Sequence, residues 1–134
     1  MGFPEDLRYT KEHEWARIED DDTVRVGVTD YAQEKLGDIV FVEVPKEGDV
    51  VKKDEAFGVI ESTKTASDLF SPASGSVLEV NEILLDAPEI INDDPYDEGW
   101  IIRIQVEDLS ELDELMDNKE YEEYVNELEE EEEE

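Results

Sequence analysis

Lys64 is the residue of this sequence whose type and surroundings most clearly allow chemistry. It follows a run with strand character at residues 57–60 and precedes the turn-forming Pro72 and Gly75, a pattern that predicts a hairpin with Lys64 near its tip. Residues 62–67 contain no acid, so the amine lies in a short neutral stretch. Such a lysine is either an ordinary solvated side chain or the target of a modifying enzyme, and the local pattern leaves both interpretations open.

The rest of the sequence is strongly acidic, with 42 Asp plus Glu against 11 Lys plus Arg and a formal net charge of -31. An acidic tail, a surface that mimics nucleic acid and adaptation to a cytoplasm of molar salt could each explain this charge. Acidic runs occur at residues 19–22, 92–94 and 97–98 as well as at 127–134, and this spread favours the halophilic interpretation. The acidity also argues against nucleic acid or anionic lipid as a direct ligand, because both bind basic surfaces.

Several kinds of chemistry lack the residues they need. The sequence contains no cysteine and a single histidine, His13, so it has no thiol chemistry of its own and no zinc site of the usual kind. Calcium-loop, P-loop, dinucleotide-binding and serine-hydrolase motifs do not occur. Because there is neither a signal-peptide start nor a run of about 18 apolar residues, we expect a soluble, cytoplasmic protein that is a poor enzyme by itself.

The elements that must position Lys64 are short strands separated by turns that contain Gly or Pro. Val24, Val26 and Val28 alternate with polar residues or glycine, as in a half-buried strand. Many short strands of this kind predict a β sandwich or barrel. The other segments with strand character are residues 9–18, 39–44, 50–51, 57–60, 76–80 and 100–106.

Helix signals within the β region are few. Residues 30–37 predict one short helix, with Thr29 or Asp30 as its cap and Gly37 at its end. Residues 83–94 contain a proline and several turn-forming Asn and Asp, which predicts a loop there.

The C-terminal segment has helical character. Residues 110–113 carry the Ser-x-x-Asp spacing of a helix start, and apolar residues at three- and four-residue intervals follow. Asn118 is a candidate cap for a second short helix, and we expect the apolar residues to pack against the β core. The predicted organisation is a β domain over residues 1–109, a helical segment at 110–129 packed on the same domain, and a disordered acidic tail at 130–134.

Ordered motifs run through the sequence from about residue 7 to residue 124. They are His13-Glu14-Trp15, Gly27-Val-Thr-Asp-Tyr-Ala-Gln33, Leu36-Gly-Asp-Ile-Val-Phe-Val-Glu-Val-Pro45, Glu61-Ser-Thr-Lys-Thr-Ala-Ser-Asp68, Ser71-Pro-Ala-Ser-Gly75, Ile91-Asn-Asp-Asp-Pro-Tyr96, Gly99-Trp100 and Lys119-Glu-Tyr121. Together they resemble the glycine cleavage system H proteins, a family of lipoyl carriers. Biotin carriers and the lipoyl domains of 2-oxoacid dehydrogenases share the fold of this family, but they resemble neither the His-Glu-Trp start nor the Pro-Tyr and Gly-Trp region.

The resemblance implies a mainly β barrel-sandwich hybrid of the lipoyl- and biotinyl-carrier type, with one short internal helix and a C-terminal helical segment. It implies that a lipoate-attaching enzyme joins (R)-lipoate to Lys64 in amide linkage. The lipoyl arm would carry the aminomethyl group of glycine from the P protein, a decarboxylase, to the T protein, an aminomethyltransferase. The L protein, a dihydrolipoyl dehydrogenase, would then reoxidise the arm. On this basis we expect a monomeric, non-catalytic carrier.

The resemblance also implies an acidic cleft for the loaded arm. Glu14 and Asp68 match the acidic cleft positions of the family, and Glu12 is a candidate third acid. Carboxylates suit this task because they hold a cationic amine by charge-assisted hydrogen bonds. The alternative for all three residues is plain surface acid, which is abundant in this sequence.

Two other functions remain open at this point. A carrier of the same fold could serve another pathway, such as lipoate relay or sulfur oxidation. An acidic interaction module whose Lys64 is never modified would belong to a different class. Acceptance by the P and T proteins separates the first alternative from glycine cleavage, and modification of Lys64 excludes the second.

Overall fold

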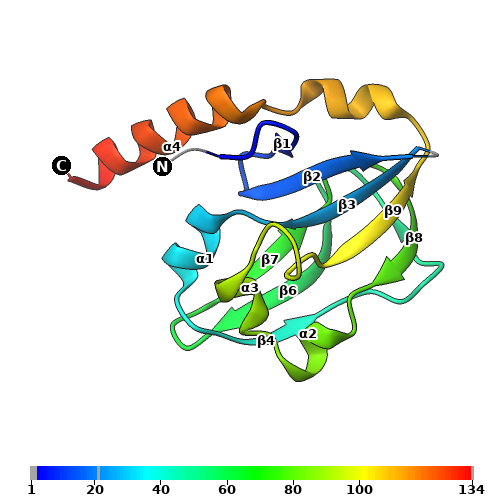
Figure 1. Ribbon diagram of the computed structural model, residues 1–134, viewed down its shortest axis with the longest axis horizontal. Coiled ribbons are helices and arrows are strands. Elements are labelled where there is room, and N and C mark those ends of the chain that lie inside the picture. Colours follow the sequence, from blue (N-terminus) through cyan, green and yellow to red (C-terminus); the bar gives the residue numbers. More distant parts are fainter. Residues whose placement is uncertain (1–2, 21, 134) are drawn as a thin grey trace.

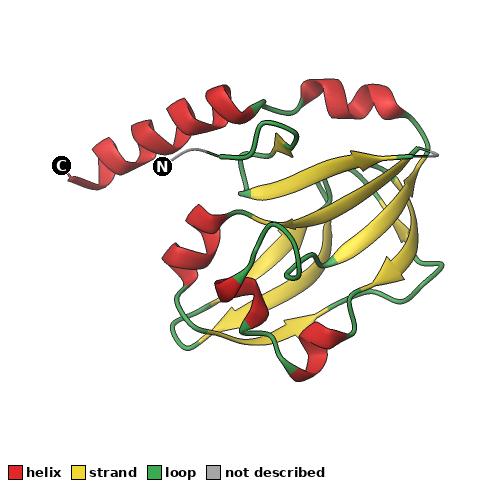
Figure 2. Ribbon diagram, in the orientation of Figure 1, coloured by secondary structure: helices red, strands yellow, loops and turns green. Residues whose placement is uncertain are grey.

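Two antiparallel sheets form the framework of the fold in a computed structural model that describes residues 3–20 and 22–133 (Figure 1, Figure 2). The first sheet contains, in spatial order, β1 (Arg8–Tyr9), β2 (Glu14–Glu19), β3 (Thr23–Val28), β9 (Ile102–Val106), β8 (Gly75–Val80) and β5 (Val50–Val51). The second sheet contains β4 (Ile39–Glu43), β6 (Ala56–Ser62) and β7 (Ala66–Phe70).

The main apolar core takes residues from both sheets. Val24 and Val26 of β3 and Ile60 and Leu69 of the second sheet are each at most 1% exposed and belong to one cluster. Side chains two residues apart on a strand point to the same face, so the valine alternation in β3 directs that strand's apolar side chains inward, as the sequence predicts. The sheets do not close into a continuous barrel, and the expected mainly β, sandwich-like architecture is confirmed.

Trp15 anchors a second, smaller cluster at the start of β2. Its side chain is fully buried, and Nε1 donates a hydrogen bond to the carbonyl of Pro95 at 2.9 Å. Gly27 pairs with Trp15 across β2 and β3, and a Cβ at position 27 would lie 2.6 Å from the indole ring. Gly27 therefore serves close packing, because only a residue without a side chain leaves room for the indole.

Helix α1 (Asp30–Leu36) matches the predicted short helix. Thr29 caps it by accepting a hydrogen bond from the amide of Ala32 at 3.2 Å. Gly37 ends it with a φ of +85°, in the left-handed region that glycine adopts without strain.

The prediction of a loop at residues 83–94 is wrong, because two one-turn helices occupy this region: α2 (Ile83–Asp86) and α3 (Ile90–Asp93). Leu84 and Ile91, one from each helix, are 0% exposed to solvent and belong to the main apolar core. Burial of these two side chains overrides the turn-forming composition of the segment. The described residues before position 100 therefore contain three short α-helices instead of the single one expected.

A 3-10 helix, η1 (Leu109–Glu114), and helix α4 (Asn118–Glu133) follow the last strand. Asp108 caps η1 by accepting from the amide of Ser110 at 3.0 Å, so Ser110 is not the cap that its spacing predicted. Asp117 occupies the capping position of α4 in place of Asn118, because its Oδ1 accepts from the amide of Glu120 at 2.8 Å.

Helix α4 lies along the β1 side of the first sheet (Figure 1). Tyr121 is fully buried, and its hydroxyl lies 2.8 Å from Oγ1 of Thr29 and 2.8 Å from Nδ1 of His13. The helix continues through residues 130–133, for which the sequence predicted disorder, and residue 134 lies outside the described residues. The boundaries of the predicted organisation remain predictions. Among the described helices none is long and apolar enough to cross a membrane.

Candidate functional site

The structure places Lys64 at the tip of the hairpin formed by β6 and β7, where the sequence predicted it. Glu61 pairs with Ala66, and the turn lies between them. The hydroxyl of Ser62 accepts hydrogen bonds from the amides of Lys64 at 3.1 Å and Thr65 at 3.2 Å, and the amide of Ser62 donates to the carbonyl of Thr65 at 2.8 Å. These bonds give the turn a defined backbone conformation while the Lys64 side chain is exposed.

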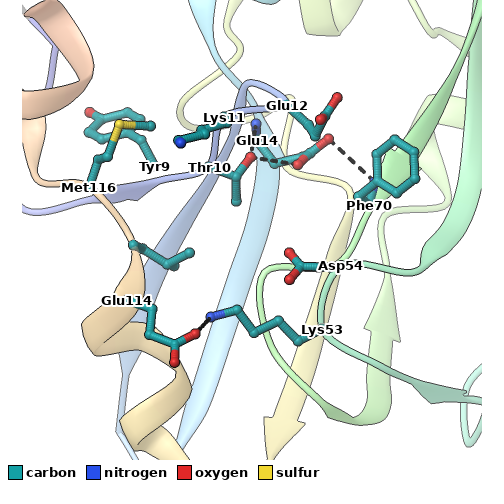
Figure 3. A pocket seen from close by; sticks show the side chains of 11 residues that line it. Tyr9, Thr10, Lys11, Glu12, Glu14, Lys53, Asp54, Phe70, Glu114 and Met116 are labelled. Atoms are coloured by element: carbon teal, nitrogen blue, oxygen red, sulfur yellow. Dashed lines mark hydrogen bonds and ion pairs between the residues drawn. The ribbon is translucent and has the colours of Figure 1, made fainter. Parts of the chain in front are cut away.

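A pocket of about 400 Å³ opens beside the far end of β7 (Figure 3). Its walls come from segments that are distant in the sequence: residues 9–12 and Glu14 at the start of the first sheet, residues 53–54, Phe70 at the end of β7, and residues 114–116, from the end of η1 onward. Charged and apolar groups both line the pocket, because it brings four carboxylates and two lysines together with Tyr9, Phe70, Leu115 and Met116.

Glu14 forms a buried part of this pocket. The side chain is 2% exposed; its Oε1 accepts a hydrogen bond from the hydroxyl of Thr10 at 2.6 Å, and its Oε2 accepts from the amide of Phe70 at 3.3 Å. Burial raises the pKa of Glu14 to about 7, with smaller increases from the charges of Glu12 and Asp54, while its two hydrogen bonds oppose the shift. Glu14 thus titrates near neutral pH, unlike an ordinary surface acid.

The raised pKa of Glu14 predicts a pH dependence of stability. A carboxyl group with a higher pKa in the folded than in the unfolded state favours folding while protonated, so its contribution is complete below about pH 4.5 and is lost as the pH rises through about 7. Glutamine does not titrate, so Glu14→Gln escapes this loss. The free energy of unfolding of Glu14→Gln minus that of wild type should therefore increase by on the order of 3 kcal/mol from about pH 4.5 to pH 8.

Urea unfolding at both pH values and molar salt measures this difference. Glu43→Gln, which changes an exposed acid outside the pocket, is the matched control and should follow wild type at both pH values. If the free energy of unfolding changes equally with pH in Glu14→Gln and in wild type, Glu14 ionises normally in the folded protein.

The other two predicted acids are placed differently. Glu12 is exposed and lines the same pocket as Glu14 (Figure 3). Asp68 is exposed on β7, outside the pocket lining, and pairs with Val59. Since residues two apart on a strand share a face, Asp68 lies on the same face of β7 as Phe70, between the Lys64 turn and the pocket.

Sequence reasoning missed the residues that shape the pocket around these acids. Lys53 forms an ion pair with Glu114 and donates a hydrogen bond to the carbonyl of Glu111 at 2.9 Å, which ties the 53–54 turn to η1. Thr10, four residues before Glu14, was the one partner of that acid near enough in the sequence to be suspected. No cluster of three or more His, Asp or Glu suited to a metal ion occurs among the described residues.

A family model described as glycine cleavage H-protein matches residues 7–128. The chain belongs to the glycine cleavage H-protein family. This H-protein sequence is 58% identical over 129 residues to a glycine cleavage system H protein of Anaeromyxobacter sp. (strain K), covering 96% of this chain and 100% of the relative. It is 55% identical over 122 residues to that of Halorhodospira halophila, covering 91% and 94% respectively.

A solved structure supports the H-protein assignment at the level of the fold. The crystal structure of a glycine cleavage system H protein from Mycobacterium marinum matches with a TM-score of 0.83 and 42% sequence identity, over 93% of this chain and 98% of that chain. The family resemblance inferred from the motifs is confirmed, and the expectation of a carrier subunit in place of an enzyme is confirmed with it.

Proposed function

We propose that this chain is the lipoyl carrier of a glycine cleavage system. Lys64 carries (R)-lipoate in amide linkage and conveys the aminomethyl group of glycine from the P protein to the T protein, after which the L protein restores the oxidised carrier. The observation that carries the proposal is an exposed lysine, held at the tip of a defined turn, in a chain of the H-protein family.

The surroundings of Lys64 fit a lipoyl group. The neighbouring side chains of Thr63, Thr65 and Ala66 are small, uncharged and exposed, so they leave room for an acyl chain and for an enzyme that attaches it. Bound lipoate supplies a redox-active disulfide, which this cysteine-free chain lacks. The amide linkage also removes the charge of the lysine, so the arm can lie against apolar surface without desolvating an ammonium group.

Glu14, Glu12 and Asp68 are proposed to hold the cationic amine of the cargo. Asp68 is four residues from Lys64, so the two Cα atoms are separated by at most about 13 Å, which is within reach of a lysine lengthened by an acyl chain. Glu14 lies beyond it in a recess that limits contact with water. Because an opposite charge favours the ionised form of an acid, a bound ammonium group should lower the pKa of Glu14 and release its proton to solvent.

Reconstitution tests the function. The lipoylated chain, supplied with glycine, a folate acceptor, an electron acceptor for the L protein and purified P, T and L proteins, should support sustained release of carbon dioxide, whereas the unmodified chain should not. A lipoylated chain that the P and T proteins reject would contradict the proposal and indicate a carrier for another pathway.

Removal of the cleft acids should shorten the lifetime of the loaded carrier. We expect Glu14→Ala and Asp68→Asn each to increase the rate of cargo loss to water by about tenfold, because each removes a charge-assisted hydrogen bond to the amine. Loading by the P protein, followed by delayed addition of the T protein, measures the fraction that survives. Glu47→Gln, an exposed acid outside the pocket, is the control. Lifetimes equal to wild type in both test variants would remove these acids from the mechanism.

The cellular setting belongs to the same proposal. We place the carrier in a cytoplasm of high salt, as a monomer that meets a lipoate-attaching enzyme and the three glycine cleavage partners in turn. Molar salt screens electrostatic steering between acidic proteins, so docking depends on shape and apolar contact.

A further inference from the structure

The backbone of the Lys64 turn is joined to the corner between α1 and β4, formed by residues 37–39. The amide of Thr63 donates a hydrogen bond to the carbonyl of Asp38 at 3.0 Å, and Ser62 pairs with Ile39 at the end of β6. The side chains of residues 63–66 are exposed and add little packing restraint. The direction in which the turn points therefore depends on the conformation of residues 37–39.

The same corner contacts the Lys64 side chain. A Cβ atom at position 37 would lie 3.2 Å from Cε and 3.6 Å from Nζ of Lys64, so the backbone of Gly37 forms a surface on which the lysine rests. A movement of the corner would therefore shift the carbonyl of Asp38, which accepts from Thr63, together with the Gly37 backbone beside the lysine.

The side chain of Asn92, in α3, holds the corner in place. Its Oδ1 accepts a hydrogen bond from the amide of Ile39 at 2.9 Å. Its Nδ2 donates to the carbonyl of Gly37 at 2.9 Å and to Oε1 of Gln33 in α1 at 2.9 Å. One half-buried amide group from a segment distant in the sequence therefore fixes both ends of the corner and links it to α1.

We propose that Asn92 is a positioning residue for Lys64 and acts through residues 37–39. It fixes the orientation in which the amine, and the arm attached to it, is presented to the enzymes that act on it. This inference rests on the proposed function, because it concerns the same lysine. Helix α3, in the segment where the sequence predicted only a loop, thereby helps to orient Lys64.

Loss of the Asn92 side chain should loosen the corner. In Asn92→Ala the carbonyl of Gly37 and the amide of Ile39 lose their partner and turn to water, and residues 37–39 gain conformational freedom. In lipoate attachment, the lipoyl adenylate, a mixed anhydride of the lipoyl carboxyl and the phosphate of AMP, reacts with the neutral Nζ of Lys64; the amide bond forms, the acyl–phosphate bond breaks, and AMP and a proton leave. Because displacement of a reacting atom by about 1 Å lowers such rates steeply, we expect about a tenfold lower kcat.

Asn81→Ala provides a matched control. Asn81 is a buried asparagine whose side chain also bridges backbone groups: its Nδ2 donates to the carbonyls of Glu98 and Trp100 at 2.8 Å each, and neither bond involves residues 37–39. Both substitutions remove a side-chain amide that hydrogen-bonds to backbone groups, so both should lower the melting temperature. Only Asn92→Ala should disturb the Lys64 turn. The comparison separates positioning from general loss of stability.

The test measures two quantities on wild type and both variants at molar salt. The first is kcat and KM for attachment of lipoate to Lys64 by a lipoate ligase, followed by intact mass. The second is amide hydrogen exchange at Thr63, on protein without the modification. We expect Asn92→Ala to lower kcat about tenfold with little change in KM, since the docking surface is intact, and to speed exchange at Thr63 about tenfold. Asn81→Ala should resemble wild type in both.

Equal kcat and equal Thr63 exchange in Asn92→Ala and Asn81→Ala would overturn the inference. A wild-type chain that the ligase does not modify would count against the proposed function instead, and the exchange measurement would still decide whether Asn92 orders the turn.

Discussion

Substitution of Lys64 by arginine is expected to abolish both lipoate attachment and glycine cleavage. Arginine retains the positive charge and the length of the side chain, and at an exposed turn it should leave the fold unchanged. Its guanidinium group stays protonated and does not form the amide that lysine forms. Intact mass should therefore show no added group, and carbon dioxide release in the reconstituted system should fall to the background of the assay.

Lys52→Arg is the matched control for this experiment. Lys52 is also exposed and precedes a turn, but it lies outside the hairpin and outside the pocket lining. It should leave modification and turnover at wild-type levels. Sustained glycine cleavage by Lys64→Arg would contradict the assignment of the carrier site.

The second large expected effect is an increase in folding stability with salt concentration. Only 11 basic residues face 42 acidic ones, so most carboxylates have no cation to pair with. The ion pairs of the described residues, such as Arg25 with Glu19 at 3.3 Å and Arg103 with Glu79 at 3.5 Å, neutralise a small part of the charge. In dilute buffer the remaining repulsion opposes the compact state, whereas at about 1 M salt a Debye length of about 3 Å screens it.

Thermal unfolding followed by circular dichroism measures the salt effect. We expect the melting temperature to rise by about 10 °C or more between dilute buffer and molar potassium chloride, which corresponds to a few kcal/mol for a domain of this size. Sucrose stabilises proteins by exclusion from their surface without screening charge, so it serves as the control and should give a smaller rise. A melting temperature that does not respond to potassium chloride would contradict the halophilic interpretation.

Local sequence signals predicted the elements that present Lys64, because the determinants of those elements are themselves local. The cap and the end of α1 are set by Thr29 and Gly37, which stand at its two termini. The hairpin tip is defined by hydrogen bonds within the turn that begins at Ser62. In both cases a few neighbouring residues specify the backbone, so the pattern of residue types was sufficient.

The helices at residues 83–94 could not be predicted in this way. Their formation depends on burial of Leu84 and Ile91 in a core that other segments build, and no property of the segment alone reveals that burial. The hydrogen bonds of Asn92 to Gly37 and Ile39 depend on the same tertiary placement of α3. The proline and the turn-forming Asn and Asp of this segment favour a loop locally, and the tertiary contacts outweigh that preference.

For Glu14 in the candidate site, the sequence identified the residue but not its environment. Among 42 acids, residue type alone gave no reason to select Glu14, and its place within the family motif supplied that reason. Its environment was not visible in the sequence, because the amide of Phe70 that donates to it lies 56 residues away. The burial that raises the pKa of Glu14 likewise follows from the packing of distant segments, and so emerges only from the structure.

The most direct test of the central claim is intact mass with peptide mapping on protein isolated from its native host during growth that requires glycine cleavage. We expect a mass increase of one lipoyl amide, located on the peptide that contains Lys64. An unmodified Lys64 in cells that are actively cleaving glycine would contradict it and would favour an acidic interaction module that keeps the fold without the chemistry.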